Sequence, residues 1–385
     1  MSSATDAVEL ARALIRRPSV TPRDAGALDV LQAALEPLGF ACRRMPFGDI
    51  DNLYARWGTT GPHLAFAGHT DVVPPGDEAA WTHPPFAGAL EDGVLYGRGA
   101  ADMKGGIAAF VAAAGEAIGA GAVRGSLSLL ITGDEEGVAL DGTKRMVAAL
   151  SAEGERIDGC IVGEPSSAET LGDLIKVGRR GSLNAWLTVR GRQGHVAYPD
   201  RAANPIPVLV ALLARLQGRA LDDGYESFPP SNLEITTVDV GNPAANVIPA
   251  TATGRLNIRF NPSHTGAALI DWLEAERAAA EAASGLSVEL KTLHSGDAFL
   301  TEPGPFVDLV LDTVQSVTGR RPEPSTSGGT SDARFIRALC PVVELGLVGA
   351  TIHQIDERAP VADIQLLQRV YAALIARYFA TSTAQ

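Results

Sequence analysis

Three apolar runs, at residues 63–68, 125–132 and 157–163, are each followed within three residues by histidine or acidic side chains. Runs of this length predict buried strands. Helices are predicted between them, from Met103 to Ile118 and from Gly142 to Leu150. Strands that alternate with helices indicate a mostly parallel sheet covered on both faces, and such sheets carry their sites at the carboxyl ends of the strands.

The histidine and acidic side chains belong to the motifs AGHTDVVP, LYGRGAADMKGG, ITGDEEG, IVGEPSS and GATIHQIDE. They are His69, Asp71, Asp102, Glu135, Glu136, Glu164 and His353. Imidazole and carboxylate groups suit a borderline divalent ion such as zinc. Two histidines with at least three carboxylates exceed the needs of one tetrahedral zinc but match two ions that share a carboxylate. The pattern therefore predicts a two-metal hydrolase.

Each motif alone allows a second interpretation. His69 and Asp71 point to the same side of an extended chain, so Asp71 can fix the tautomer of a metal-bound imidazole, but the motif can also be a surface turn. Asp102 can bridge two cations or cap the helix that follows it. Glu135 and Glu136 diverge, which suits a general base beside a ligand, although an acidic pair is commonly a solvated loop.

The middle of the chain has a different order of elements. Strand and helix patterns between residues 180 and 294 follow the order β-α-β-β-α-β, which is typical of a ferredoxin-like α+β domain. We therefore expect a mixed, mostly parallel α/β catalytic domain, formed by residues 1–179 and 295–385, with this smaller domain inserted. An edge strand of the inserted domain can pair with a second copy, which predicts a dimerisation domain and a homodimer.

Composition excludes several classes of partner. The net charge of −13 and the absence of a basic run argue against nucleic acid and anionic membrane. Cys42, Cys160 and Cys340 form no CxxC pair, so neither a disulfide scaffold nor a thiolate metal site is expected. The N-terminal segment has no signal pattern and no run of ~18 apolar residues occurs, so we expect a cytoplasmic protein.

Longer stretches of the sequence carry a resemblance over nearly the whole chain. They are AGHTDVVPPGD, LYGRGAADMKGG, GEPSS, KVGRRGSLNAWLTVRGRQGHVAYP, NVIP, STSGGTSDARF and TIH. The chain resembles the dizinc exopeptidases and deacylases, a family that includes aminoacylase, acetylornithine deacetylase and carboxypeptidase. Within the family, GRRGS, GHVAYP and GGTSDARF resemble the motifs of a member of lysine and diaminopimelate biosynthesis. The resemblance therefore implies removal of succinate from a succinylated diamino dicarboxylate.

The resemblance also implies a role for each site residue. Two divalent ions per subunit, Zn²⁺ or Co²⁺, would be held by Asp102 between them, by His69 and Glu164 on one side, and by Glu136 and His353 on the other. The implied catalytic residues are Glu135 as general acid/base, Asp71 as the group that orients His69, and His195 as an oxyanion donor from the partner subunit. The implied substrate contacts are Arg179, Tyr198, Asn246, Arg259, Gly329 and Thr330.

Other functions remain open at this point. Acetylornithine deacetylase or aminoacylase would use the same ions and base, although the former lacks the Gly-Gly-Thr-Ser-Asp stretch. A non-catalytic metal-binding protein is a further alternative, against which the presence of Glu135 argues. Gly349 departs from close relatives, which often have Asn there, so a side-chain contact to substrate is lost at this position.

Overall fold

The computed structural model describes residues 5–382, so residues 1–4, which are part of the segment inspected for a targeting signal, lie outside it. The described chain divides into two compact units. Unit 1 comprises the chain up to Val177, Thr301–Ser325 and the chain from Ser331 onward, and unit 2 comprises Gly178–Leu300 and Thr326–Thr330. None of the helices within residues 5–382 is long and apolar enough to span a membrane.

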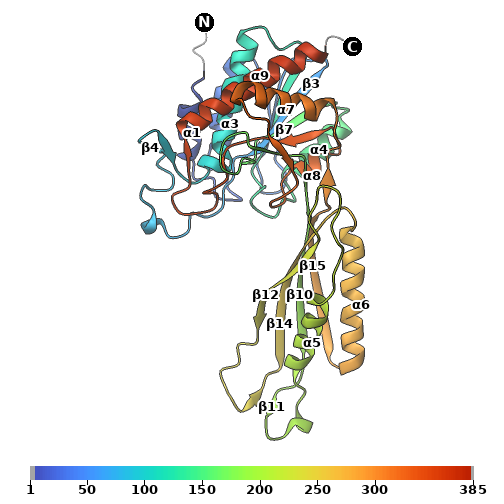
Figure 1. Ribbon diagram of the computed structural model, residues 1–385. Coiled ribbons are helices and arrows are strands. Elements are labelled where there is room, and N and C mark those ends of the chain that lie inside the picture. The colour runs from blue at the N-terminus through green and yellow to red at the C-terminus, as the bar shows by residue number, and fades with distance from the viewer. Residues whose placement is uncertain (1–4, 383–385) are drawn as a thin grey trace. The chain divides into compact units, whose positions relative to one another are not determined.

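Unit 1 contains the larger set of elements (Figure 1). They are α1 Ala7–Ile15, α2 Ala27–Leu35, η1 Glu36–Leu38, β1 Ala41–Arg44, β2 Leu53–Trp57, β3 His63–His69, η2 Glu78–Ala80, β4 Ala89–Glu91, β5 Val94–Tyr96, η3 Ala100–Lys104, α3 Gly105–Gly119, β6 Ser126–Thr132, α4 Thr143–Ala152, β7 Gly159–Val162, β8 Leu174–Lys176, α7 Pro305–Thr318, β17 Glu323–Ser325, α8 Ala333–Ile336, β18 Val342–Glu344, β19 Arg358–Pro360 and α9 Val361–Ser382.

Unit 2 is built from fewer and longer elements. They are β9 Gly178–Arg179, β10 Gly181–Arg190, β11 Gly194–His195, η4 Pro199–Arg201, α5 Pro205–Gln217, β12 Asn232–Asp239, β13 Val247–Ile248, β14 Thr251–Phe260, α6 Gly266–Ser284, β15 Ser287–Gly296 and β16 Phe299–Leu300.

The central sheet of unit 1 has eight strands in the order β1-β2-β6-β3-β7-β18-β8-β17. Its middle strands, β6, β3, β7 and β18, are parallel, and antiparallel pairs lie toward the edges. Every residue of β3, β6 and β7 is buried, as expected when helices cover both faces of a parallel sheet. The mixed, mostly parallel α/β class predicted from the sequence is confirmed.

The parallel strands bring their carboxyl ends to one edge of the sheet. His69 of β3 is in register with Thr132 of β6, and Ala67 is in register with Val162 of β7. The loops that follow these strands therefore begin side by side, which places the sequence motifs of β3, β6 and β7 next to one another.

The helix after LYGRGAADMKGG begins later than the sequence predicts. α3 starts at Gly105, and Lys104 is its N-cap residue, without a side-chain capping bond. Asp102 lies before it in a non-helical conformation, with φ −119° and ψ 95°. Because Asp102 does not cap the helix, its carboxylate is available for another role.

Unit 2 has a four-stranded antiparallel sheet in the order β12-β14-β10-β15. This is the strand order of the βαββαβ arrangement. Helices α5 and α6 lie beside this sheet (Figure 1). The apolar sides of β10 and β14 pack with these helices into one cluster that includes Leu183, Leu209, Leu256 and Leu269. The alternate residues of β10 and β14 face away from this cluster. They are polar apart from the exposed Trp186, as the two-residue period of a strand predicts.

Candidate metal centre

His69 lies at the centre of a buried group of acidic side chains. It is the last residue of β3 and is 1% exposed. Its Nε2 is 3.2 Å from Oδ1 of Asp102 and 3.6 Å from Oε1 of Glu164. Glu164 follows β7, the strand beside β3, so the sheet itself sets the distance between these two side chains.

His353 joins the same group from the loop before β19. Its Nε2 is 2.8 Å from Oε1 of Glu136 and 3.4 Å from Oδ2 of Asp102. Asp102 thus has one carboxylate oxygen toward each imidazole. The hydrogen bond to Asp102, followed by that to Glu136, raises the pKa of His353 to about 10.

Two triads of side chains have ligand atoms within 4.8 Å of one another. They are His69, Asp102 and Glu136, and His69, Glu135 and Glu164. Together with His353, which contacts Asp102 and Glu136, and Asp71, which contacts His69, all seven acidic and histidine residues of the sequence motifs lie in this group. The geometry also places Glu135 within this distance, although the resemblance gives it a proton-transfer role.

The electrostatics of the group indicate a shortage of positive charge. Burial, followed by the charges of Asp102 and Glu135, raises the pKa of Glu164 well above its ordinary range. Burial likewise raises the pKa of Glu135, and Asp332 adds to this effect. Burial alone would lower the pKa of His69, but Asp102 and Glu164 raise it well above its ordinary value. Carboxylates crowded in this way bind protons or cations.

Asp71 contacts both the histidine and the acidic loop. Nδ1 of His69 donates to the backbone carbonyl of Asp71 at 2.9 Å, whereas the carboxylate oxygen Oδ1 is 3.7 Å from that nitrogen. The carboxylate instead accepts the backbone N–H groups of Glu135, at 3.3 Å, and Glu136, at 3.1 Å. Asp71 therefore fixes the imidazole through its main chain and the loop after β6 through its side chain.

The remaining residues implied by the resemblance lie on unit 2. Tyr198 and Asn246 are joined to the His195 turn by backbone hydrogen bonds, from Tyr198 N–H to the His195 carbonyl and from Val196 N–H to the Asn246 carbonyl. Nδ1 of His195 accepts the N–H of Ala197 at 3.1 Å, which leaves the proton of the neutral ring on Nε2.

Arg179 and Arg180 directly precede β10, and Arg259 lies on β14, the strand paired with β10. Arg179 is buried and donates to the Ser327 carbonyl at 3.2 Å, within the segment that also contains Gly329 and Thr330. Burial, followed by the charge of Arg180, lowers the pKa of Arg259. Sequence reasoning did not select Arg180, although it lies directly beside Arg179 in GRRGS.

Sequence reasoning also missed two charged residues beside the metal-type motifs. Arg98 and Glu357 form a buried ion pair, with Nη1 of Arg98 2.7 Å from Oε2 of Glu357. Arg98 belongs to LYGRGAADMKGG, and Glu357 is the last residue of GATIHQIDE. Both residues could have been selected from the sequence, because each lies in a motif that also contains a candidate metal ligand.

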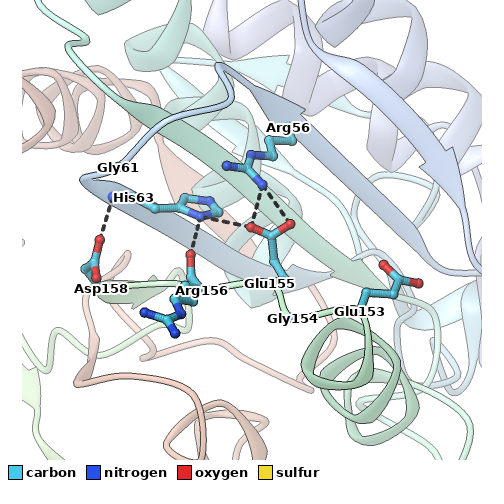
Figure 2. A pocket seen from close by; sticks show the side chains of 8 residues that line it. All are labelled: Arg56, Gly61, His63, Glu153, Gly154, Glu155, Arg156 and Asp158. Atoms are coloured by element: carbon cyan, nitrogen blue, oxygen red, sulfur yellow. Dashed lines mark hydrogen bonds and ion pairs between the residues drawn. The ribbon is translucent and has the colours of Figure 1, made fainter.

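A separate cavity of about 470 Å³ lies at the other end of β3 (Figure 2). It is lined by Arg56, His63, Glu155 and Asp158, among others. Arg56 binds Glu155 through 2.5 and 2.7 Å contacts, and Asp158 accepts the backbone N–H of His63. Arg56 and Glu155 neutralise each other, and Asp158 is bonded to a backbone N–H, so the cluster around His69 is the candidate functional site.

Comparison with known proteins agrees with this geometry. The model of peptidase family M20/M25/M40 matches residues 65–377. The chain belongs to this family.

Relatives in the family include proteins called succinyl-diaminopimelate desuccinylase. The one from Phenylobacterium zucineum (strain HLK1) is 68% identical over 99% of this chain and 100% of that relative. The one from Caulobacter vibrioides (strain NA1000 / CB15N) is 65% identical, covering 99% of this chain and 98% of that relative.

Solved structures share the fold. An M20 family metallo-carboxypeptidase from Sulfolobus solfataricus has a TM-score of 0.82 at 16% identity, covering 97% of this chain and 99% of that chain. A dinuclear metal binding peptidase of the M20 family from Bacillus subtilis has a TM-score of 0.72 at 17% identity, covering 97% of this chain and 98% of that chain.

Proposed function

We propose that this member of peptidase family M20/M25/M40 hydrolyses the amide bond of N-succinyl-LL-2,6-diaminopimelate, giving succinate and LL-2,6-diaminopimelate. The observation that carries the proposal is the full-length identity of 68% to a succinyl-diaminopimelate desuccinylase. The clustered histidines and carboxylates of unit 1 supply the chemistry that such a hydrolase needs.

The residues of the cluster fit two divalent cations. Their donors are imidazole nitrogens and carboxylate oxygens, which suit Zn²⁺ and also Co²⁺. We infer that Asp102 is shared, because one of its oxygens faces each imidazole. His69 and Glu164 would then hold one ion, and Glu136 and His353 the other, as the contacts within each pair support.

Bound ions supply Lewis acidity that makes water a nucleophile near neutral pH. Glu135 takes the proton of the attacking water and returns it to the departing amine. The position of Glu135 supports this role, because its carboxylate lies within 4.8 Å of the ligand atoms of His69 and Glu164. Asp71 keeps Glu135 in place through the backbone N–H that it accepts.

The substrate carries several carboxylates, and unit 2 provides cationic and polar partners. Arg179 and Arg259 are proposed to bind them, because the guanidinium fork matches a carboxylate. The charge of Arg180 beside Arg259 adds to the attraction of this region for an anion. Tyr198, Asn246, Gly329 and Thr330 are proposed as further substrate contacts.

We also propose a homodimer in which His195 of the partner subunit stabilises the oxyanion. β12 is an edge strand of the unit 2 sheet and carries the exposed side chain of Val238, so it can pair with a second copy. His195 is exposed, and the proton on Nε2 makes the neutral ring a hydrogen-bond donor.

A substrate panel tests the activity. Succinyl-diaminopimelate and acetylornithine are hydrolysed side by side, with the metal content of each preparation measured. We expect a strong preference for the succinyl amide and loss of activity on chelation that zinc or cobalt restores. A preference for acetylornithine would favour the deacetylase alternative, and full activity without metal would contradict the two-metal mechanism.

The roles of Glu135 and Glu136 are separated by two isosteric changes. Glu135→Gln should lower kcat by on the order of 100-fold and leave metal content unchanged, because only proton transfer is lost. Glu136→Gln should lower metal content. If Glu135→Gln loses metal while Glu136→Gln keeps it and is inactive, the two roles are exchanged.

Mixed dimers test the shared site. His195→Ala and Glu135→Gln should each be nearly inactive alone, whereas a mixed dimer would have one site with an intact Glu135 and an intact His195 from its partner. Partial recovery of activity after subunit exchange is expected. No recovery in dimers that have exchanged would contradict donation of His195 by the partner.

A further inference from the structure

The Arg98–Glu357 pair is a deeply buried ion pair, with side-chain exposures of 2% and 0%. Arg98 lies between β5 and η3, and Glu357 directly precedes β19. A buried ion pair is weak support for stability by itself, because removing both charges from water is costly. Its other hydrogen bonds therefore indicate what the pair does.

Glu357 holds the main chain that carries Asp102. Its Oε1 accepts the backbone N–H groups of Ala101, at 3.1 Å, and Asp102, at 3.0 Å. These N–H groups belong to the short η3 segment before α3, in which Asp102 departs from helical geometry. The carboxylate of Glu357 thus determines where the side chain of Asp102 leaves the main chain.

Arg98 holds the main chain that carries His353. Its Nη1 donates to the Gln354 carbonyl at 3.2 Å, and its Nη2 lies 3.4 Å from the His353 carbonyl. His353 has φ 60°, a left-handed conformation that a residue with a side chain adopts only when its surroundings hold it. The ring of Trp81 lies 5.2 Å from the guanidinium and keeps it in place.

We propose that Arg98 and Glu357 are positioning residues that hold Asp102 and His353 at the separation required to bind one cation together. The inference rests on the proposed function, because it takes these two side chains as metal ligands. One ion pair connects both backbone segments, so a shift of either partner changes the distance between the ligands. Residues behind the direct ligands of a metal commonly have this effect, and their loss costs about 10- to 100-fold in metal affinity.

The experiment uses neutral replacements of the pair. In Arg98→Met/Glu357→Gln no buried charge is left alone, and the Gln oxygen can still accept the N–H groups of Ala101 and Asp102. In Arg98→Met/Glu357→Leu that acceptor is lost as well. Zn²⁺ affinity is measured by calorimetry, and the coordination geometry by the visible absorption of bound Co²⁺. We expect affinity for at least one of the two ions to fall about 10-fold in the first variant and about 100-fold in the second, with an altered Co²⁺ spectrum.

Arg98→Lys provides a variant that keeps the positive charge beside Glu357. Lysine has one nitrogen in place of the guanidinium fork, so it cannot also hold the carbonyls of the His353 loop. The variant should fold, which thermal unfolding verifies. It should nevertheless bind the ion assigned to Glu136 and His353 more weakly than the wild type does. Wild-type affinity and an unchanged Co²⁺ spectrum in Arg98→Lys would overturn the proposal, whether or not the double variants fold.

The control is Arg56→Met/Glu155→Gln, which removes the ion pair at the other end of β3 (Figure 2). It should bind Zn²⁺ and Co²⁺ as the wild type does. Equal weakening in the control would also overturn the proposal, because the effect would then be general. If the wild-type protein binds no Zn²⁺ or Co²⁺, the proposed function fails instead, so the two failures are distinguishable.

Discussion

Replacing Asp71 with Asn should separate stability from catalysis. The side chain is 1% exposed, and burial raises its pKa from the ordinary 3.8 to about 6, even though His69 and two backbone N–H groups oppose this shift. Ionisation of Asp71 in the folded, metal-free protein is therefore less favourable than in the unfolded chain by up to ~3 kcal/mol, and at pH 7 this cost lowers the free energy of unfolding. Asn resembles the neutral acid in shape and hydrogen bonding, so the Asp71→Asn variant should avoid this cost.

The sign follows from linkage. A carboxyl group whose pKa is raised on folding lowers stability as pH rises, because the unfolded chain releases the proton first. The free energy of unfolding of the metal-free wild type should fall between pH 4 and pH 7 because Asp71 ionises. Asp71→Asn lacks this carboxyl group and should not show this fall. Urea unfolding of both metal-free proteins across this range measures the difference. The variant should be more stable by up to ~3 kcal/mol at pH 7 and nearly equal to the wild type at pH 4.

Activity should change in the opposite direction. Asn offers one oxygen to the two N–H groups of Glu135 and Glu136, which the carboxylate accepts with one oxygen each. The loop after β6 should then shift, and kcat of the metal-loaded enzyme should fall about 10- to 100-fold. A variant with unchanged kcat, or one that is less stable than wild type at pH 7, would refute this reasoning.

Asp173→Asn is the matched control. Its carboxylate also accepts backbone N–H groups, those of Ala168, Glu169 and Thr170 at 2.8, 2.8 and 3.0 Å. Here burial raises the pKa of Asp173, but the hydrogen bonds outweigh it and the pKa is lowered overall. Asp173→Asn should therefore reduce stability at pH 7 and leave kcat unchanged.

Two further predictions concern the metal ligands. Because Asp102 raises the pKa of His353 to about 10, this imidazole is protonated in the metal-free protein at pH 7 and must release its proton to bind a metal. Zinc affinity should rise with pH, and calorimetry in buffers of different ionisation enthalpy should show proton release; identical heats would contradict this. Gly346→Ala should destabilise the protein by about 1–3 kcal/mol and weaken metal binding, because the added Cβ would lie 2.3 Å from the Glu164 carbonyl. Gly349→Ala should be tolerated, since its Cβ meets the nearest atom at 3.4 Å, and equal losses in both variants by thermal unfolding would contradict the packing argument.

The sequence by itself determined the class of the sheet and the chemical nature of the site. Apolar runs of strand length must be buried, and histidine or acidic residues lie at the end of the buried strand β3 and just after β6 and β7. His69 and Glu164 could be selected for this reason without coordinates. Periodicity likewise indicated the alternating strands of unit 2, because one face of each strand must be apolar.

Only the tertiary structure decided which groups touch. Asp71 binds the backbone of Glu135 and Glu136, and Glu357 binds the backbone of Asp102, through hydrogen bonds between segments far apart in the chain. Almost any residue can supply the backbone N–H of such a bond, and the two partners have no fixed spacing in the chain. A sequence pattern therefore cannot reveal these bonds. The place of each ligand in the site is set by these contacts, whereas the identity of the ligands is set by the sequence.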